Sequence, residues 1–222
     1  MKEAILFDLD GTLTNTDTVH YETWQDLLRD YSLEIDPIYY DKHFSGRMNK
    51  DILRDILPQL SEAEAVALGD RKEAEFRRRA ETSLVPLAGL LFLLDWCDRN
   101  HIGKAVVTNA PVANAEFMLR VLKLHDRFPI LIIGEQVEFG KPHPMPYQVG
   151  LEKLGVDASR AIAFEDSPTG IKSSVGAGLY TVGLDSTHPA QKLYAMGASM
   201  VVSDFTDAEL MSFLQTEFGH QL

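Results

Sequence analysis

The chain has 222 residues, of which 45% are hydrophobic and 24% charged, as expected for an ordered globular domain that carries a smaller insertion. Its 33 acidic and 21 basic residues give a formal net charge of -12, which disfavours nucleic acid as a partner because a polyphosphate backbone would be repelled. No segment reaches the roughly eighteen apolar residues of a membrane span, so we expect a cytoplasmic protein without a membrane partner.

The first predicted element is a buried strand over residues 4–9, an apolar run that ends at Asp-Gly. Asp8 and Asp10 leave the end of this strand one residue apart, and Gly11 lets the backbone turn sharply there. Two neighbouring carboxylates repel, and a divalent cation is the usual means by which such a pair stays ionised. The segment therefore predicts a metal site at the strand end, with a turn capped by aspartate as the alternative.

Residues 14–82 are predicted to form an all-helical insertion. Apolar and aromatic residues recur at helical spacing from His20 to Tyr31 and again over 52–57, and Ser61-Glu62-Ala63-Glu64 resembles a capping box. The last helix of the insertion carries basic residues among glutamates, which we interpret as a solvated, ion-paired face and not as an anion site. These basic residues are Arg71, Lys72, Arg77, Arg78 and Arg79.

From residue 86 onward, predicted helices and strands alternate. This alternation predicts a doubly wound α/β fold, in which helices cover both faces of a parallel sheet and ligands bind beyond the carboxyl ends of the strands. The only cysteine, Cys97, lies on the first of these helices, where we expect a core residue. The predicted helices cover 88–100, 112–124 and 144–154, the strands cover 104–108, 129–133 and 160–164, and two further helix and strand pairs follow.

Polar residues end two more of the predicted strands, and a lysine lies in the loop between them. Thr108 and Asn109 follow the second strand, although Thr-Asn is also an ordinary strand exit. Lys141 lies between a glycine and a proline, in a rigid loop that suits a fixed ligand. Glu165 and Asp166 end the fourth strand and could hold a metal ion, while the serine that follows could instead cap the next helix.

The segment Asp8-Leu9-Asp10-Gly11-Thr12, followed in order by Thr108, Lys141 and Asp166, resembles the four motifs of the haloacid dehalogenase-like superfamily. The helical insertion matches the position of this family's helical cap, and the layout is most similar to that of the β-phosphoglucomutase-like phosphatases. The resemblance covers essentially the whole chain. It implies a Rossmann-like core of residues 1–13 and 83–222 and an all-helical cap domain of residues 14–82.

The resemblance also implies a magnesium-dependent phosphatase that hydrolyses a small phosphomonoester, such as a sugar phosphate, through an aspartyl-phosphate. Asp8 would be the nucleophile, and Asp10 the general acid and base. Thr108 and the backbone N–H of Asn109 would hold the phosphoryl oxygens, and Lys141 would offset negative charge on the nucleophile and the phosphate.

The metal implied by the resemblance is Mg²⁺, which prefers hard oxygen ligands and phosphate. Its ligands would be the Asp8 carboxylate, the Asp10 carbonyl and Asp166, with Glu165 beside them. The expected partner is a small phosphorylated metabolite, and no oligomeric state is predicted.

Five residues of the helical insertion are predicted to contribute to substrate binding. His20 stands where the group often has a histidine near the nucleophile loop, although packing on an apolar helix face is an equal alternative. Gly46 matches the family glycine of the cap. Asn49 stands where β-phosphoglucomutases carry an arginine, and Arg47 or Lys50 could substitute for it or simply be surface charges.

Other reactions of the superfamily remain as alternatives. Dehalogenation and phosphonate hydrolysis are disfavoured, because relatives that perform them generally lack the aspartate at position 10. A sugar-phosphate mutase of the β-phosphoglucomutase type is the main alternative, since it shares every core motif. A catalytically silent binding module is a further alternative, which the intact set of Asp8, Asp10, Lys141 and Asp166 makes improbable.

Overall fold

The computed structural model describes residues 1–44 and 47–221. The chain forms two compact units, one of Met1–Asn15 with Val85–Leu222 and the other of Thr16–Leu84. The chain passes between the units close to the predicted ends of the helical insertion at 14 and 82. Among the described residues, no helix is both long enough and apolar enough to cross a bilayer.

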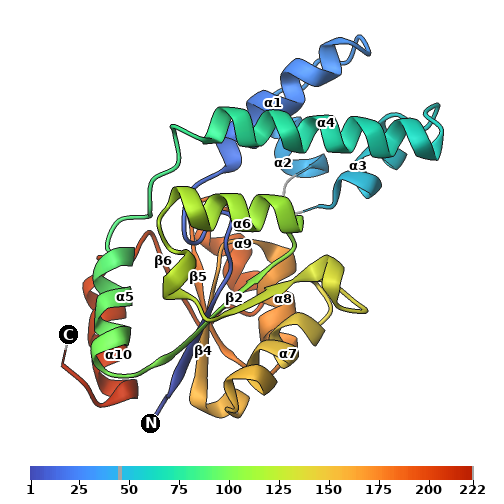
Figure 1. Cartoon of the computed structure of the whole chain (residues 1–222). Coiled ribbons are helices and arrows are strands. Elements are labelled where there is room, and N and C mark those ends of the chain that lie inside the picture. The colour runs from blue at the N-terminus through green and yellow to red at the C-terminus, as the bar shows by residue number, and fades with distance from the viewer. Residues whose placement is uncertain (45–46, 222) are drawn as a thin grey trace. The chain divides into compact units, whose positions relative to one another are not determined.

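The first unit is built on a parallel sheet that has helices on both sides (Figure 1). Its strand order is β3-β2-β1-β4-β5-β6. The central strand β1 lies between β2 and β4, with Ala4 opposite both Gly103 and Ala161. Every residue of β1 is buried, as is typical of a parallel strand that is covered on both faces. The predicted doubly wound α/β fold is confirmed. The strands are β1 (Ala4–Phe7), β2 (Gly103–Thr108), β3 (Ile130–Ile133), β4 (Ala161–Glu165), β5 (Tyr180–Leu184) and β6 (Met200–Val202).

Alternate side chains of β1 enter two different layers of core. Leu6 packs with Val107, Tyr147 and neighbouring residues on the face covered by α7. Phe7 points to the opposite face and stacks on Phe164, with ring centroids 5.4 Å apart. The helices of this unit are α5 (Leu90–Arg99), α6 (Val112–Val121), α7 (Met145–Leu154), α8 (Pro168–Gly176), α9 (Ala190–Ala195) and α10 (Ala208–Phe218).

The predicted helices form at the expected places but are shorter. Helix α5 begins at Leu90 because Gly89 before it has a left-handed φ of 77°. Helix α6 stops at Val121, and Lys123 just beyond it has a positive φ of 58°. Cys97 is fully buried on α5, as predicted, and burial raises the pKa of its thiol to about 12.

The second unit is helical and has its own core around Trp24. The predicted capping box is confirmed, because the Ser61 hydroxyl accepts from the Glu64 N–H and the Glu64 carboxylate accepts from the Ser61 N–H. Its helices are α1 (Asp17–Arg29), α2 (Pro37–His43), α3 (Asn49–Ile56) and α4 (Glu62–Ala80).

The solvated, ion-paired face predicted for the last helix of this unit is confirmed for three arginines, whereas Lys72 is ion-paired but not solvated. Arg71 pairs with Asp30, and Arg78 and Arg79 both pair with Glu75. Lys72, in contrast, is buried on α4 and pairs with the adjacent Glu73. Its ammonium also lies over the ring of Phe76, 5.7 Å from the centroid, so this lysine belongs to the inner face of the helix.

Candidate active site

The ends of three adjacent strands bring the candidate site together. Asp8 directly follows β1, Thr108 ends β2, and Glu165 ends β4. Because β2 and β4 flank β1, all three residues emerge at one edge of the sheet. The backbone N–H of Asp8 donates to the carbonyl of Phe164 at 2.9 Å and continues the pairing of β1 with β4.

Lys141 reaches this edge from the loop before α7 and lies between two carboxylates. Its Nζ is 2.6 Å from Oδ1 of Asp8 and 2.5 Å from Oε1 of Glu165. Burial disfavours the charged ammonium, but the two carboxylates outweigh this effect and hold the pKa of Lys141 above its usual value. The lysine therefore stays protonated and is a fixed positive charge in the site.

The side chain of Asn109 fastens the loop that carries Lys141. Its Nδ2 donates to the carbonyl of Lys141, and its Oδ1 accepts from the Lys141 N–H, both at 3.0 Å. Gly134 and Gly140 leave room for this amide, since an added Cβ on either would lie 2.3 Å and 3.0 Å from Oδ1. The sequence suggested only the backbone N–H of Asn109 as functional, so this clamp was missed.

Glu165 is fully buried at the start of the loop that leads into α8. Its Oε1 accepts from Lys141 and also from the hydroxyl of Tyr147 at 2.6 Å. The carboxylate fills the space above Gly170, where an added Cβ would lie 1.8 Å from Oε2. The predicted cap is also present, because the Ser167 hydroxyl accepts from the Gly170 N–H at 3.0 Å.

Carboxylate oxygens of Asp8, Glu165 and Asp166 all lie within 4.8 Å of one another in a buried cluster. Burial raises the pKa of Asp8 to about 8, with Lys141 opposing this shift and Glu165 adding to it. Burial, followed by the charges of Asp8 and Glu165, also holds the pKa of Asp166 well above its usual value. Two of these carboxylates bind the ammonium of Lys141 and the third lies close to both, so a hard divalent cation would neutralise the excess charge of the ionised cluster. The donor set therefore fits Mg²⁺.

The loop after β1 is closed by short-range contacts. The Gly11 N–H donates to the Thr14 carbonyl at 2.8 Å, and Gly11 has a left-handed φ of 75°. An added Cβ on Gly11 would lie only 2.0 Å from Oδ2 of Asp166, so glycine permits this close approach. Asp10 is half-buried on the same loop, and its charge contributes to the raised pKa of Asp8.

Two hydroxyl groups border the site. Thr108 is buried, and its Oγ1 accepts from the Ala110 N–H at 2.9 Å. Thr187, in the loop after β5, was not predicted. Its buried hydroxyl makes no hydrogen bond of good geometry in the part of the chain that the structure describes. Burial raises the pKa of Asp166, and the nearby Thr187 hydroxyl opposes part of this rise.

The predicted substrate residues of the helical unit make contacts within that unit. The ring of His20 stacks on Phe76 at 4.0 Å, and its Nδ1 is 2.9 Å from Nζ of Lys72. Asn49 donates through Nδ2 to Oε1 of Glu73 at 2.5 Å. Packing of His20 on an aromatic side chain agrees with the alternative that the sequence left open for it.

The remaining candidates of this unit are two cations and a glycine. Arg47 pairs with Asp55 and also donates to the carbonyl of His43 at 2.9 Å. Lys50 is exposed on α3. Gly46 lies outside the residues that the structure describes.

Comparison with known proteins independently supports the family resemblance that was drawn from the sequence motifs. The family model described as haloacid dehalogenase-like hydrolase matches residues 5–184. Validoxylamine A 7'-phosphate phosphatase of Streptomyces hygroscopicus subsp. limoneus is 31% identical over 93% of this chain and 96% of its own length. The 2-deoxyglucose-6-phosphate phosphatase 2 of Saccharomyces cerevisiae is 29% identical over 94% of this chain and 90% of its own length. The crystal structure of CbbY from Rhodobacter sphaeroides in complex with phosphate has a TM-score of 0.82 at 26% identity, covering 93% of this chain and 96% of that one.

Proposed function

Because the chain belongs to the haloacid dehalogenase-like hydrolase family, in the group related to β-phosphoglucomutase, we propose that it is a Mg²⁺-dependent phosphatase of sugar phosphates or similar small phosphomonoesters. That it is a phosphatase agrees with the named activities of its relatives. One observation carries the proposed mechanism: a buried Asp8 at the end of the central strand, with the ammonium of Lys141 held 2.6 Å from its carboxylate.

The proposed reaction has two displacements at phosphorus. In the first, a carboxylate oxygen of Asp8 bonds to phosphorus, the bond from phosphorus to the sugar oxygen breaks, and Asp10 gives that oxygen a proton. In the second, Asp10 takes a proton from water, the water oxygen bonds to phosphorus, and the carboxylate of Asp8 leaves. The products are the free alcohol and inorganic phosphate, and both aspartates return to their starting states.

The remaining residues of the site bind and orient the phosphoryl group. Lys141 stands beside the attacking carboxylate, where its charge offsets the negative charge on the transferring oxygens. The Thr108 hydroxyl and the Asn109 N–H are proposed to hold two of these oxygens. Mg²⁺, when bound by Asp8, the Asp10 carbonyl and Asp166, supplies charge neutralisation that lowers the barrier of both displacements.

Contacts within the helical unit favour a phosphatase over a mutase. A mutase has to hold the second phosphate of a bisphosphate, which needs cations that are free to bind it. Here Arg47 already pairs with Asp55, and Asn49 is neutral and donates to Glu73, which leaves Lys50 as the exposed cation among the candidate residues. A single exposed lysine is a weaker site for a second phosphate than the arginine that β-phosphoglucomutases carry at the position of Asn49. That His20, Gly46, Arg47, Asn49 and Lys50 contact the substrate's sugar part stays a proposal.

A substrate panel tests this function. Phosphate release is measured from glucose 6-phosphate, fructose 1-phosphate, a hexitol phosphate and p-nitrophenyl phosphate, with MgCl₂ and with EDTA. We expect release that requires Mg²⁺ and is fastest for one of the sugar or polyol phosphates. The mutase is tested separately with β-glucose 1-phosphate and its bisphosphate activator, from which we expect no glucose 6-phosphate. Metal-independent release, or efficient isomerisation, would contradict the proposal.

A further inference from the structure

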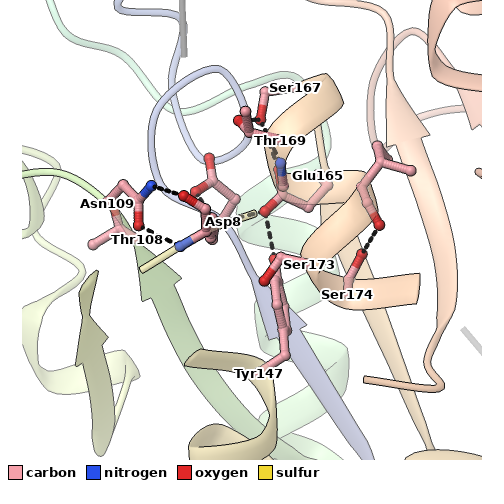
Figure 2. A network of polar contacts seen from close by, with 12 residues as sticks. Asp8, Thr108, Asn109, Tyr147, Glu165, Ser167, Thr169, Ser173 and Ser174 are labelled. Carbon is pink, nitrogen blue, oxygen red and sulfur yellow. Dashed lines mark hydrogen bonds and ion pairs between the residues drawn. The ribbon is translucent and has the colours of Figure 1, made fainter. Parts of the chain in front are cut away.

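Tyr147 makes a contact with the site that the sequence did not indicate. It lies fully buried on α7, and its hydroxyl donates to Oε1 of Glu165 at 2.6 Å (Figure 2). The same oxygen accepts from Lys141, whose ammonium also binds Asp8. A continuous chain of hydrogen bonds therefore runs from Tyr147 through Glu165 and Lys141 to the proposed nucleophile.

We propose that Tyr147 is a positioning residue for the phosphatase reaction, whose hydroxyl holds Glu165 so that the ammonium of Lys141 stays against Asp8. This inference rests on the proposed function, because it assigns Tyr147 a part in the work of the proposed nucleophile.

The physical basis is competition between two carboxylates for one ammonium. Glu165 is inaccessible to water, so its negative charge is satisfied only by protein donors, among them Lys141 and Tyr147. Without the tyrosine hydroxyl, the carboxylate would attract the ammonium more strongly. Because Lys141 is shared with Asp8, that attraction would draw it away from the nucleophile.

Several features keep the hydroxyl in this role. The Tyr147 side chain is a neutral phenol, so its hydroxyl can donate to the Glu165 carboxylate. Its ring lies 5.2 Å from Nζ of Lys141 and limits the space open to the ammonium. Gly150, on the same helix, allows α7 to lie close to β1, since an added Cβ would be 2.7 Å from a methyl group of Leu6.

A buried tyrosine also needs a partner for its hydroxyl merely to avoid a desolvation penalty. The test must therefore separate loss of positioning from loss of stability. Tyr147→Phe removes only the hydroxyl and keeps the ring beside Lys141. Ser174→Ala is the matched control, because the buried Ser174 hydroxyl bonds to Thr181 at 2.9 Å in the same unit and contacts none of the proposed catalytic residues (Figure 2).

The experiment measures kcat and KM for p-nitrophenyl phosphate at saturating MgCl₂, with thermal unfolding of each protein. We expect Tyr147→Phe to lower kcat about tenfold and to leave KM within about twofold of the wild-type value. A tenfold loss of kcat corresponds to the free energy of about one hydrogen bond to a charged group. Ser174→Ala should lose comparable thermal stability and keep kcat within about twofold. A Tyr147→Phe enzyme with the kcat of an active wild type would overturn the inference, and so would an equal loss of kcat in Ser174→Ala. An inactive wild type would instead refute the proposed function.

A double-mutant cycle with Glu165→Gln tests whether Tyr147 acts on catalysis through Glu165. If Tyr147 acts through the carboxylate, then Tyr147→Phe should lower kcat by less than about twofold once Glu165 is an amide. A full tenfold further loss in the double variant would show that the hydroxyl acts by another path, and would overturn the assignment.

Discussion

The ammonium of Lys141 lies 2.6 Å from the carboxylate of Asp8, although 133 positions separate the two residues in the chain. Only 3% of the lysine side chain and 10% of the aspartate side chain are exposed, so water screens this pair little. Glu165 shares the same ammonium from the other side. A substitution at any of the three is therefore expected to affect both stability and catalysis.

Asp8→Asn should abolish phosphate release while leaving the fold intact, because an amide cannot form the proposed aspartyl-phosphate. Activity is measured with the best substrate of the panel, and folding by circular dichroism and thermal unfolding. Near-normal turnover in a preparation free of wild-type enzyme would rule out Asp8 as the nucleophile.

Asp10→Asn should slow both displacements, with a larger effect on substrates whose leaving group needs a proton. We therefore expect a greater loss of kcat with a sugar phosphate than with p-nitrophenyl phosphate, whose leaving group departs readily as an anion. The pH dependence of kcat should also lose the limb that reports the general acid. Equal losses for both substrates with an unchanged pH profile would remove Asp10 from this role.

Lys141→Met should lower the free energy of unfolding by about 3 kcal/mol, because it removes the counter-ion of the fully buried Glu165 and of the ionised form of Asp8. The measurement is urea unfolding at neutral pH with EDTA present. The control is Arg29→Ala, which breaks an exposed pair with Asp26 and should cost less than about 1 kcal/mol. If both variants show the same small decrease in the free energy of unfolding, the buried ion pairs of Lys141 contribute no more to stability than an exposed pair does.

The metal-free protein should become less stable as the pH rises from about 4 to about 8, through the contribution of Asp8. Burial raises the pKa of this carboxyl to about 8, from 3.8 in the unfolded chain. Between these values the folded state holds a proton that the unfolded state has released, so raising the pH favours unfolding until the folded pKa is passed. Asp166, whose pKa is also raised by burial, acts in the same direction.

The Asp8→Asn variant isolates this contribution. The unfolding free energy of wild type minus that of the variant, measured in EDTA, should fall between pH 5 and pH 8. MgCl₂ at pH 8 should recover more stability in the wild type than in the variant, because it binds the ionised carboxylate. A difference that does not change with pH would contradict the raised pKa.

Gly11→Ala should weaken Mg²⁺ binding at least tenfold, because the new Cβ would lie 2.0 Å from Oδ2 of Asp166 and displace that carboxylate. Gly155→Ala is the matched control. Gly155 has a similar positive φ of 69°, yet an added Cβ there has nothing within 4 Å. Titration calorimetry with MgCl₂ should give unchanged affinity for the control. If both variants lost the same Mg²⁺ affinity, backbone strain and not displacement of Asp166 would explain the loss.

Residues that follow directly on a strand could be predicted from the sequence. A short apolar run that ends in a polar residue predicts both the strand and its exit, and the resemblance to the family's motifs then singled out Asp8, Thr108 and Asp166 among such residues. The contacts of Tyr147 and Thr187 could not be predicted, because they depend on the packing of α7 and on the path of the loop after β5. These are tertiary features without a local pattern.

The error at Lys72 has a different cause. Its neighbours in sequence are basic and acidic, so the segment has the composition of a solvated surface. Yet Leu68, Lys72, Phe76 and Ala80 recur every four residues, and all four are buried on one side of α4. The four-residue spacing therefore indicated that Lys72 lies on the inner face of α4, but its charged neighbours in the sequence suggested a solvated position.

The position of β1 in the middle of the sheet has a consequence for biosynthesis. This strand is synthesised before the other strands of the sheet, but its neighbour β4 ends only at Glu165, so the 157 residues from Asp8 to Phe164 have to be synthesised before both sides of β1 can be paired. A polypeptide released before Ala161 would expose the backbone of an apolar strand along one whole side. Such prematurely terminated products should aggregate or be degraded, and no fragment of that length should retain partial activity.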